Sequence, residues 1–257
     1  MDFVVKLSES RHGIKLMNES NFMNNLFETF GGSNEDSFGF ISSNMLLVGS
    51  KLYQMDNNLF NPFENVNFMK MFKSYLLGPI NMDKPHHKDI ALSCLYFLFS
   101  QKEHCLVKHL IQNPENHDII NAFLRISKST NEEHRKSFLI ALRMLLKIDH
   151  SAPQDDRTSD ILQMIFTNIC TPLNFPNEFG PINDSISYLV NIADTPFENE
   201  ELLCLRLFKQ LIKHKWGFKA FFLNSKAIKY VLERKGVKTE KEIIEKKYSL
   251  INQIVKE

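Results

Sequence analysis

Three long apolar runs constrain the fold of this chain more than any other feature of its sequence. They occupy residues 89–99, 137–148 and 201–212, and none of them contains glycine or proline. Such runs are too long for typical strands, and their composition favours helices that are buried on most sides. Asn-Gly and Asp-Gly turns between alternating segments are missing. The sequence therefore predicts an all-α protein.

A small residue recurs at one point of the long helical segments, and leucine follows it in all but the first, weaker match. Its positions are Gly49, Cys94, Ala141, Cys204 and Ser249. The successive spacings are 45, 47, 63 and 45 residues. Three of the four lie in or close to the range of about 40–47 residues that armadillo and HEAT repeats show. The long interval contains residues 171–184, whose three prolines indicate a loop insertion. A small side chain at this position would allow a neighbouring helix to approach closely.

Two shorter amphipathic helices are expected in each interval. They are residues 13–18 and 22–30, 59–65 and 68–77, 105–112 and 119–127, 161–169 and 186–193, and 216–223 and 227–233. Three helices per unit predict an armadillo/HEAT-like helical-repeat solenoid of about five units, forming one domain over residues 1–257. Each unit would bury its apolar face only against its neighbours, and the excess of phenylalanine in the chain would be explained by packing between repeats. Both ends resemble interrupted repeats, so we expect part of a longer array.

Charge and composition exclude several classes of protein. Basic and acidic residues number 31 and 30, and the formal net charge of +1 argues against a dedicated nucleic-acid binder. Residues 226–247 carry a local basic excess, but the interleaved charges are typical of a solvated helix face. No long apolar run suggests a signal peptide or a membrane span. Four cysteines without a Cys-x-x-Cys pair indicate a reducing compartment, so we expect a cytoplasmic location, with the nucleus as the alternative.

Candidate chemistry is sparse along the chain. His104, Cys105 and His109 could share a helical segment, but no second pair completes a zinc site. Gly-x-Ser-x-Gly, phosphate-loop and dinucleotide-binding motifs are all missing. Acid pairs such as Glu132-Glu133 and Glu200-Glu201 stand at expected helix starts, where the helix dipole favours them. We therefore expect no catalytic residue, no cofactor and no metal, and we interpret Cys94, Cys204 and Trp216 as packing residues.

The C-terminal part of the chain carries a recognisable set of residues, which are Trp216, Phe222, Asn224, Ser225, Tyr230, Val231, Arg234, Lys247, Tyr248 and Leu250. These positions resemble a known family of proteasome assembly chaperones, called 26S proteasome non-ATPase regulatory subunit 5. Near the start, His12-Gly13 and Met55-Asp56 are similar to pairs in the same family. Ala227-Ile228 departs from the Gly-Phe that the family usually carries. The resemblance covers essentially the whole chain and corresponds to roughly the C-terminal half of a family member.

The resemblance implies a non-enzymatic role. Members of this family form a solenoid that binds the C-terminal domain of one AAA ATPase subunit of the proteasome base, regulatory subunit 7, during assembly. We would then expect a monomer before partner binding, with no nucleic-acid or membrane partner. Polar residues on the third helices would line a concave partner-binding face. The candidates, chosen by helix position alone, are Lys51, Gln54, Arg143, Lys147, Arg206, Lys209, Lys247 and Asn252.

Two other interpretations remain open. A different armadillo-type scaffold or adaptor would have the same helical pattern. Peptide-binding members of that class carry repeated tryptophans on their third helices, whereas this chain has one tryptophan outside them. An enzyme would need a deep site with convergent histidines, cysteines or carboxylates.

Overall fold

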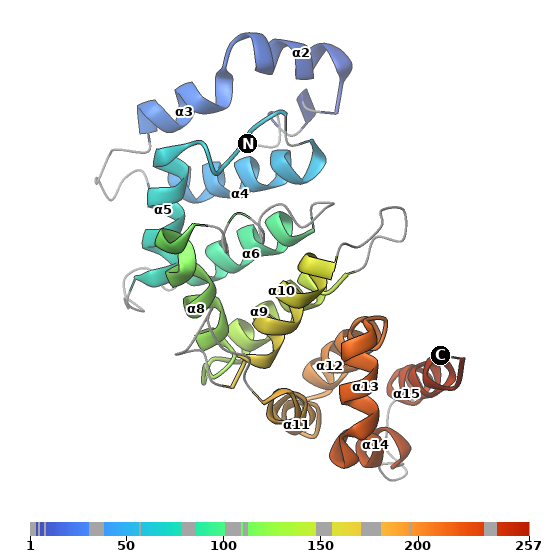
Figure 1. Ribbon diagram of the computed structural model, residues 1–257. Coiled ribbons are helices and arrows are strands. Elements are labelled where there is room, and N and C mark those ends of the chain that lie inside the picture. Colours follow the sequence, from blue (N-terminus) through green and yellow to red (C-terminus); the bar gives the residue numbers. More distant parts are fainter. Residues whose placement is uncertain are drawn as a thin grey trace. The chain divides into compact units, whose positions relative to one another are not determined.

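The computed structural model describes residues 4, 6–7, 9–30, 39–56, 58–78, 86–100, 109, 113–147, 156–170, 181–195, 197–233 and 241–256. All regular elements in these residues are helices, which confirms the predicted all-α class (Figure 1). The chain divides into two compact units, Met1–Leu106 and Val107–Glu257. Each unit is a succession of packed helices, as an α-helical repeat solenoid requires.

Five helices of the first unit are described by the structure. They are α2 (Arg11–Glu19), α3 (Phe22–Phe30), α4 (Gly39–Met55), α5 (Val66–Leu77) and α6 (His87–Phe99). The two long apolar helices, α4 and α6, pack directly against each other, and α5 packs against both (Figure 1). The predicted helices 13–18, 22–30, 68–77 and 89–99 are thus confirmed to within a few residues.

Aromatic packing holds the first unit together. The Phe27 ring stacks on Phe60 with centroids 5.3 Å apart, and both rings meet Phe68 edge-on. Gly49 in α4 lies beneath this cluster, because a Cβ added there would stand 2.9 Å from the Phe60 ring. A larger side chain at Gly49 would therefore collide with the Phe60 ring, so this position does require a small residue.

The helix predicted over residues 59–65 is wrong, because this segment forms turns. The Asn61 side chain accepts a hydrogen bond from the backbone N–H of Phe63, and the Asp56 carboxylate accepts one from Asn58. Such bonds from side chains to nearby backbone compete with helix formation. Pro62 also disfavours helical geometry at the preceding residue. The buried Leu59 and Phe60 were mistaken for one face of a helix.

The second unit is longer. Its elements are η3 (Pro114–Asn116), α8 (His117–Ile126), α9 (Glu132–Leu145), α10 (Asp156–Thr167), α11 (Ile182–Ala193), α12 (Glu198–Leu211), α13 (Lys215–Leu223), α14 (Ser225–Leu232) and α15 (Lys241–Lys256). The predicted helices 119–127, 137–148, 161–169, 186–193, 201–212, 216–223 and 227–233 all correspond to helices here. Of the predicted helix 105–112, only His109 is described, and residues 171–180 of the proposed insertion also lie outside the described residues.

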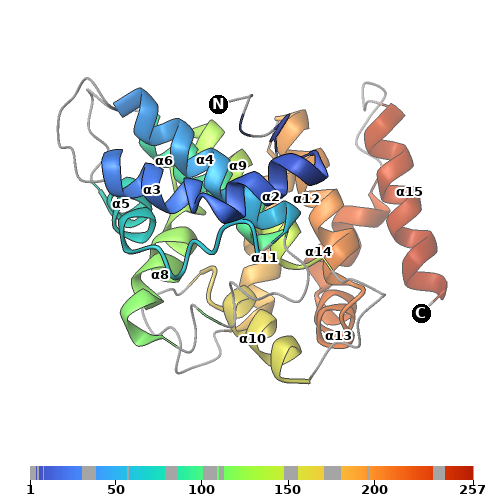
Figure 2. The ribbon, with the colours of Figure 1, turned by 90° about the horizontal axis from the view of Figure 1, so that it is seen from above.

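The third helices of consecutive repeats pack on one another in the second unit. α12 packs against α9 on one side and against α15 on the other, and α11 packs against α12, α13 and α14. Figures 1 and 2 both show α15 at the outer side of α12. This succession is the arrangement in which each repeat buries its apolar face on the next.

The recurring small residues lie inside these contacts, with one exception. Cys94, Ala141 and Cys204 are completely buried. Ser249 is only partly buried, and its hydroxyl accepts a hydrogen bond from the amino group of Lys209 on α12. Phenylalanine fills much of the surrounding core, as predicted. The largest fully buried side chains include Phe27, Phe68, Phe72, Phe123, Phe138, Phe166, Phe208 and Phe221.

Candidate partner-binding surface

The structure brings most of the predicted partner-binding residues onto three packed helices. Arg143 lies on α9 and Lys147 just beyond its end, Arg206 and Lys209 lie on α12, and Lys247 and Asn252 lie on α15. Lys51 and Gln54 lie on α4 of the first unit, where both are partly exposed. We call the exposed side of α9, α12 and α15 that carries Arg143, Lys147, Arg206, Lys209 and Asn252 the third-helix face.

Two of these side chains are held by contacts between α12 and α15. The Arg206 guanidinium forms an ion pair with Glu242 at 3.0 Å, and both side chains are partly exposed. The Lys209 amino group donates a hydrogen bond of 2.9 Å to the Ser249 hydroxyl. An exposed ion pair of this kind stabilises a fold by only about 0–1 kcal/mol. The contacts therefore orient the two cations at the surface more than they stabilise the chain.

Lys247 does not belong to the third-helix face, and its predicted role there is corrected. The residue is only 7% exposed. Its amino group donates a hydrogen bond of 3.0 Å to the Tyr230 carbonyl and lies 4.0 Å from the centre of the Tyr230 ring. The Glu201 carboxylate, 3.6 Å away, supplies the opposite charge. Lys247 thus joins α15 to α12 and α14, and it is unavailable to a partner in this conformation.

Three lysines gather near the ends of α9 and α12. They are Lys147, Lys209 and Lys213. The pKa of the Lys213 amino group is lowered, first by partial burial and then by the positive charges of Lys209 and Lys147. Lys213 lies one helical turn beyond Lys209, and the ring of the adjacent His214 lies 2.9 Å from the carbonyl of Leu146, which precedes Lys147. The chain therefore places these three lysines in one positively charged cluster.

An open hollow lies beside this cluster, between α12 and α15. Its volume is about 610 Å³, and it is lined by Lys209, Ile244, Glu245, Tyr248, Ser249, Asn252 and Gln253. Ile244 and Tyr248 are 52% and 66% exposed, although both are large apolar side chains. Two predicted residues, Lys209 and Asn252, therefore line a concave, partly apolar site, which is the usual setting for ligand contacts.

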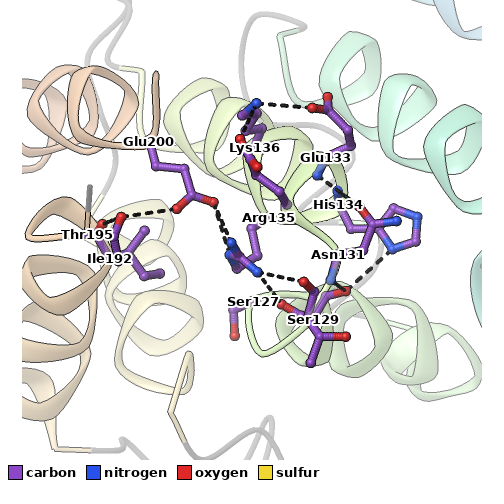
Figure 3. A network of polar contacts seen from close by, with 12 residues as sticks. Ser127, Ser129, Asn131, Glu133, His134, Arg135, Lys136, Ile192, Thr195 and Glu200 are labelled. Atoms are coloured by element: carbon purple, nitrogen blue, oxygen red, sulfur yellow. Dashed lines mark hydrogen bonds and ion pairs between the residues drawn. The ribbon is translucent and has the colours of Figure 1, made fainter. Parts of the chain in front are cut away.

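A buried ion pair joins the first turn of α9 to the first turn of α12 (Figure 3). The Glu200 carboxylate is 1% exposed and accepts hydrogen bonds from Nη2 and Nε of Arg135 at 2.9 and 3.0 Å. Arg135 also donates to the carbonyls of Ser129 and Thr130, and the Thr195 hydroxyl lies 3.4 Å from the second carboxylate oxygen. Burial without a partner would be costly for Glu200, and Arg135 supplies that partner.

A second buried carboxylate follows directly along the chain. The Tyr230 hydroxyl donates a 2.6 Å hydrogen bond to Glu201, beside the contact of Glu201 with Lys247. Burial and the adjacent negative charge of Glu201 raise the pKa of Tyr230, which keeps the phenol protonated. Consecutive acids in the first turn of α12 thus connect it to both neighbouring third helices. Sequence reasoning treated these acids as helix-dipole partners and missed their burial.

Several of the residues that carry the family resemblance have structural roles. Trp216 packs against Phe166 at 5.6 Å, as expected for a packing residue. Asn224 caps α14 by accepting a hydrogen bond from Ala227. Tyr248 and Phe222 are exposed, whereas Arg234 lies outside the described residues. Cys94 and Cys204 are buried fillers, and burial raises the pKa of the Cys94 thiol to about 12.

The suspected metal ligands do not come together in the residues that the structure describes. No group of three or more histidines, cysteines and carboxylates is placed to hold a metal ion there. Of the suspected ligands His104, Cys105 and His109, only His109 is described, and its ring lies beside the Asn113 amide. No described helix is both long and apolar enough to cross a membrane.

Comparison with known proteins agrees with this fold and identifies the family. No curated protein matches the chain. A crystal structure of an engineered protein, from the Northeast Structural Genomics Consortium, matches with a TM-score of 0.59 at 11% identity and covers 99% of this chain and 88% of its own. That likeness concerns the fold alone. The family described as proteasome non-ATPase 26S subunit matches residues 1–257. The chain therefore belongs to the family of proteasome non-ATPase 26S subunits.

Proposed function

We propose that this chain is a non-enzymatic assembly chaperone of the base of the 26S proteasome regulatory particle. Its partner would be the C-terminal domain of an AAA ATPase subunit, regulatory subunit 7. Family membership supports a proteasome-associated role, and the resemblance to the C-terminal half of regulatory subunit 5 supplies the specific partner. The observation that carries the proposal is the third-helix face, where α9, α12 and α15 pack consecutively and present exposed cations.

The proposed mechanism is steric and electrostatic. A row of packed helices holds the third-helix face in one arrangement, because the buried Glu200 and Glu201 contacts join each third helix to the next. A preorganised surface loses little conformational freedom when a partner docks. Exposed cations at its edge would accelerate the encounter and make binding sensitive to salt, which suits a chaperone that must leave later.

Co-purification with the six base ATPases tests this function. The C-terminal domain of each ATPase subunit is expressed with the chain, and the retained domains are identified. We expect selective retention of regulatory subunit 7. The double variant R143E/K147E on the third-helix face should retain less of it, whereas the matched variant K15E/K70E in the first unit should retain as much as the wild type.

The same experiment can overturn the proposal. A folded chain that retains none of the six domains, or all of them equally, would contradict the assembly-chaperone function and favour a different armadillo-type scaffold. Equal retention by wild type and R143E/K147E would exclude the third-helix face as the contact while leaving the partner intact.

A further inference from the structure

We infer that the hollow between α12 and α15, together with the neighbouring lysines, binds an acidic peptide segment that carries an apolar side chain. We call this combination, formed by Lys147, Lys209, Lys213, Ile244 and Tyr248, the lysine-tyrosine groove. The inference rests on the proposed function in one respect only, that the segment belongs to the partner. The groove and its chemistry follow from the chain itself.

The charge of the groove selects an acidic ligand. Lys213 lies one helical turn beyond Lys209, and the contact of 2.9 Å between the His214 ring and the Leu146 carbonyl brings Lys147 next to Lys213. Burial and the charges of the two other lysines lower the pKa of Lys213, in agreement with this placement. One lysine at the end of a helix is explained by the helix dipole. Three lysine side chains that come together from two helices repel one another through their positive charges. A carboxylate placed between them would relieve that repulsion.

The acidic residue that lines the hollow does not cancel this field. Glu245 lies 3.8 Å from Lys241 on the same helix, so its charge already has an opposite partner. Glu242, on the same turn of α15, is paired with Arg206. The Lys209 amino group donates its hydrogen bond to a neutral hydroxyl, that of Ser249. The lysine end of the groove is consequently the end that attracts an anion.

The apolar part of the groove sets the second requirement. Ile244 and Tyr248 are one helical turn apart on α15, so their side chains share one face. Both border the hollow and are more than half exposed. A volume of about 610 Å³ accommodates one or two apolar side chains of a bound segment. Tyr248 can also donate a hydrogen bond to a backbone carbonyl through its hydroxyl.

A peptide is favoured over a nucleic acid as the ligand. The three lysines form a compact cluster, and the remainder of the hollow is lined by the apolar side chains already named, by the amides of Asn252 and Gln253, and by Ser249 and the paired Glu245. Nucleic acid would require an extended basic track along its backbone. A chain segment with alternating acidic and apolar residues matches both halves of the groove at once.

Fluorescence anisotropy with synthetic peptides tests this inference on the chain alone. The probe is a fluorescein-labelled peptide of sequence DEDFEELDED, and the controls are NQNFQQLNQN and KRKFKKLKRK at the same length and with the same apolar residues. We expect the acidic peptide to bind most tightly. Its affinity should fall about tenfold or more between roughly 0.05 M and 0.5 M salt, because the surface charges become screened.

Variants locate the site and separate its two halves. K209E/K213E should weaken binding of the acidic peptide by about tenfold or more, which corresponds to about 1.4 kcal/mol. The matched control K15E/K70E makes the same change of charge in the first unit and should bind as the wild type does. Y248A should weaken binding without altering its salt dependence. Circular dichroism and thermal unfolding of each variant show whether its fold is retained. If the charge-reversed variant K209E/K213E does not fold, the neutral variant K209Q/K213Q is used in its place.

The outcomes are distinct. Equal binding of the acidic and neutral peptides, or unchanged binding by K209E/K213E, overturns the inference. Displacement of the peptide by an oligothymidylate of equal charge, at equal concentration, also overturns it, because the groove would then attract any polyanion. Selective peptide binding by a chain that retains no ATPase domain would leave the groove established and refute the proposed function instead.

Discussion

Removal of the Arg135 guanidinium is the sharpest test of how the repeats are held together. The substitution Arg135→Met keeps an apolar stem of similar length but leaves Glu200 without its cationic partner. Glu200 is 1% exposed, so water cannot replace the two hydrogen bonds of 2.9 and 3.0 Å that it loses. The carbonyls of Ser129 and Thr130 are closer to solvent and can bond to water instead.

The expected loss follows from this geometry. Breaking a buried ion pair by removal of one partner costs about 3–5 kcal/mol. Glu200 keeps the Thr195 hydroxyl near its second oxygen and stands in the first turn of α12, where the helix dipole favours a carboxylate. We therefore expect the lower end, a decrease of about 3 kcal/mol in the free energy of unfolding. The urea midpoint should fall by about 1 M or more.

Urea unfolding followed by two signals measures this effect. Far-ultraviolet circular dichroism reports all helices, and fluorescence of Trp216, the single tryptophan, reports the second unit. Arg143→Met on the same helix α9 is the matched control, because Arg143 forms no ion pair with any residue that the structure describes. It should change the free energy of unfolding by no more than about 0.5 kcal/mol. The double variant R135M/E200Q should recover at least about 1 kcal/mol, because no charge is then left buried.

Two results would refute this reasoning. A loss below about 1 kcal/mol for R135M would mean that Glu200 is not buried as the structure shows. A double variant as unstable as R135M would mean that the loss comes from packing of the arginine stem and not from the unpaired carboxylate.

Three further predictions concern other parts of the structure. Asn224→Ala should lower the free energy of unfolding by about 1–2 kcal/mol, and urea unfolding should show a smaller loss for Asn131→Ala. Both residues cap helices, but Asn224 is buried, so water cannot replace its hydrogen bond. Gly49→Ala should cost about 1–3 kcal/mol, since its Cβ would meet the Phe60 ring at 2.9 Å; an unchanged melting temperature would contradict this. Burial lowers the pKa of His214 below its ordinary 6.5. Between about pH 7 and 5, the unfolded chain therefore binds more protons than the folded chain at this residue. The free energy of unfolding should consequently fall as the pH decreases through this range. His214→Asn should flatten that decline, and an identical slope would exclude His214 as a cause.

Helical periodicity explains why most of the fold could be predicted. The long segments around Cys94, Ala141 and Cys204 repeat their apolar residues at helical spacing and contain no breakers, so local and tertiary preferences agree. The spacing of the small residues also identified which helices pack on their counterparts in the next repeat. Where local side-chain bonding competed with that pattern, as at Asn61 and Pro62, the prediction of a helix was wrong.

The candidate site was predictable only in outline. Position on a third helix selected Lys209 and Asn252, which do border the hollow. The same rule selected Lys247, which is buried against Tyr230 and Glu201. Lys209 and Lys247 lie on different third helices and look alike in sequence, because the helical pattern gives the direction of a side chain around its own helix but not the identity of its neighbour. Lys213 was overlooked, although it lies one turn beyond Lys209 on the same chain segment.

By itself, the sequence determined the helical class, the repeat and the positions of the core phenylalanines, because these depend on spacing along one chain. Only the tertiary structure decided which charged residues are buried and which oppositely charged groups they contact. Glu200 and Glu201 occupy the first turn of α12, and sequence alone assigns both to the helix dipole. Packing buries one against Arg135 and the other against Tyr230 and Lys247, while it leaves Lys147, Lys209 and Lys213 together at the surface. A charge is stabilised by whatever surrounds it in space, and that environment forms only when the repeats stack.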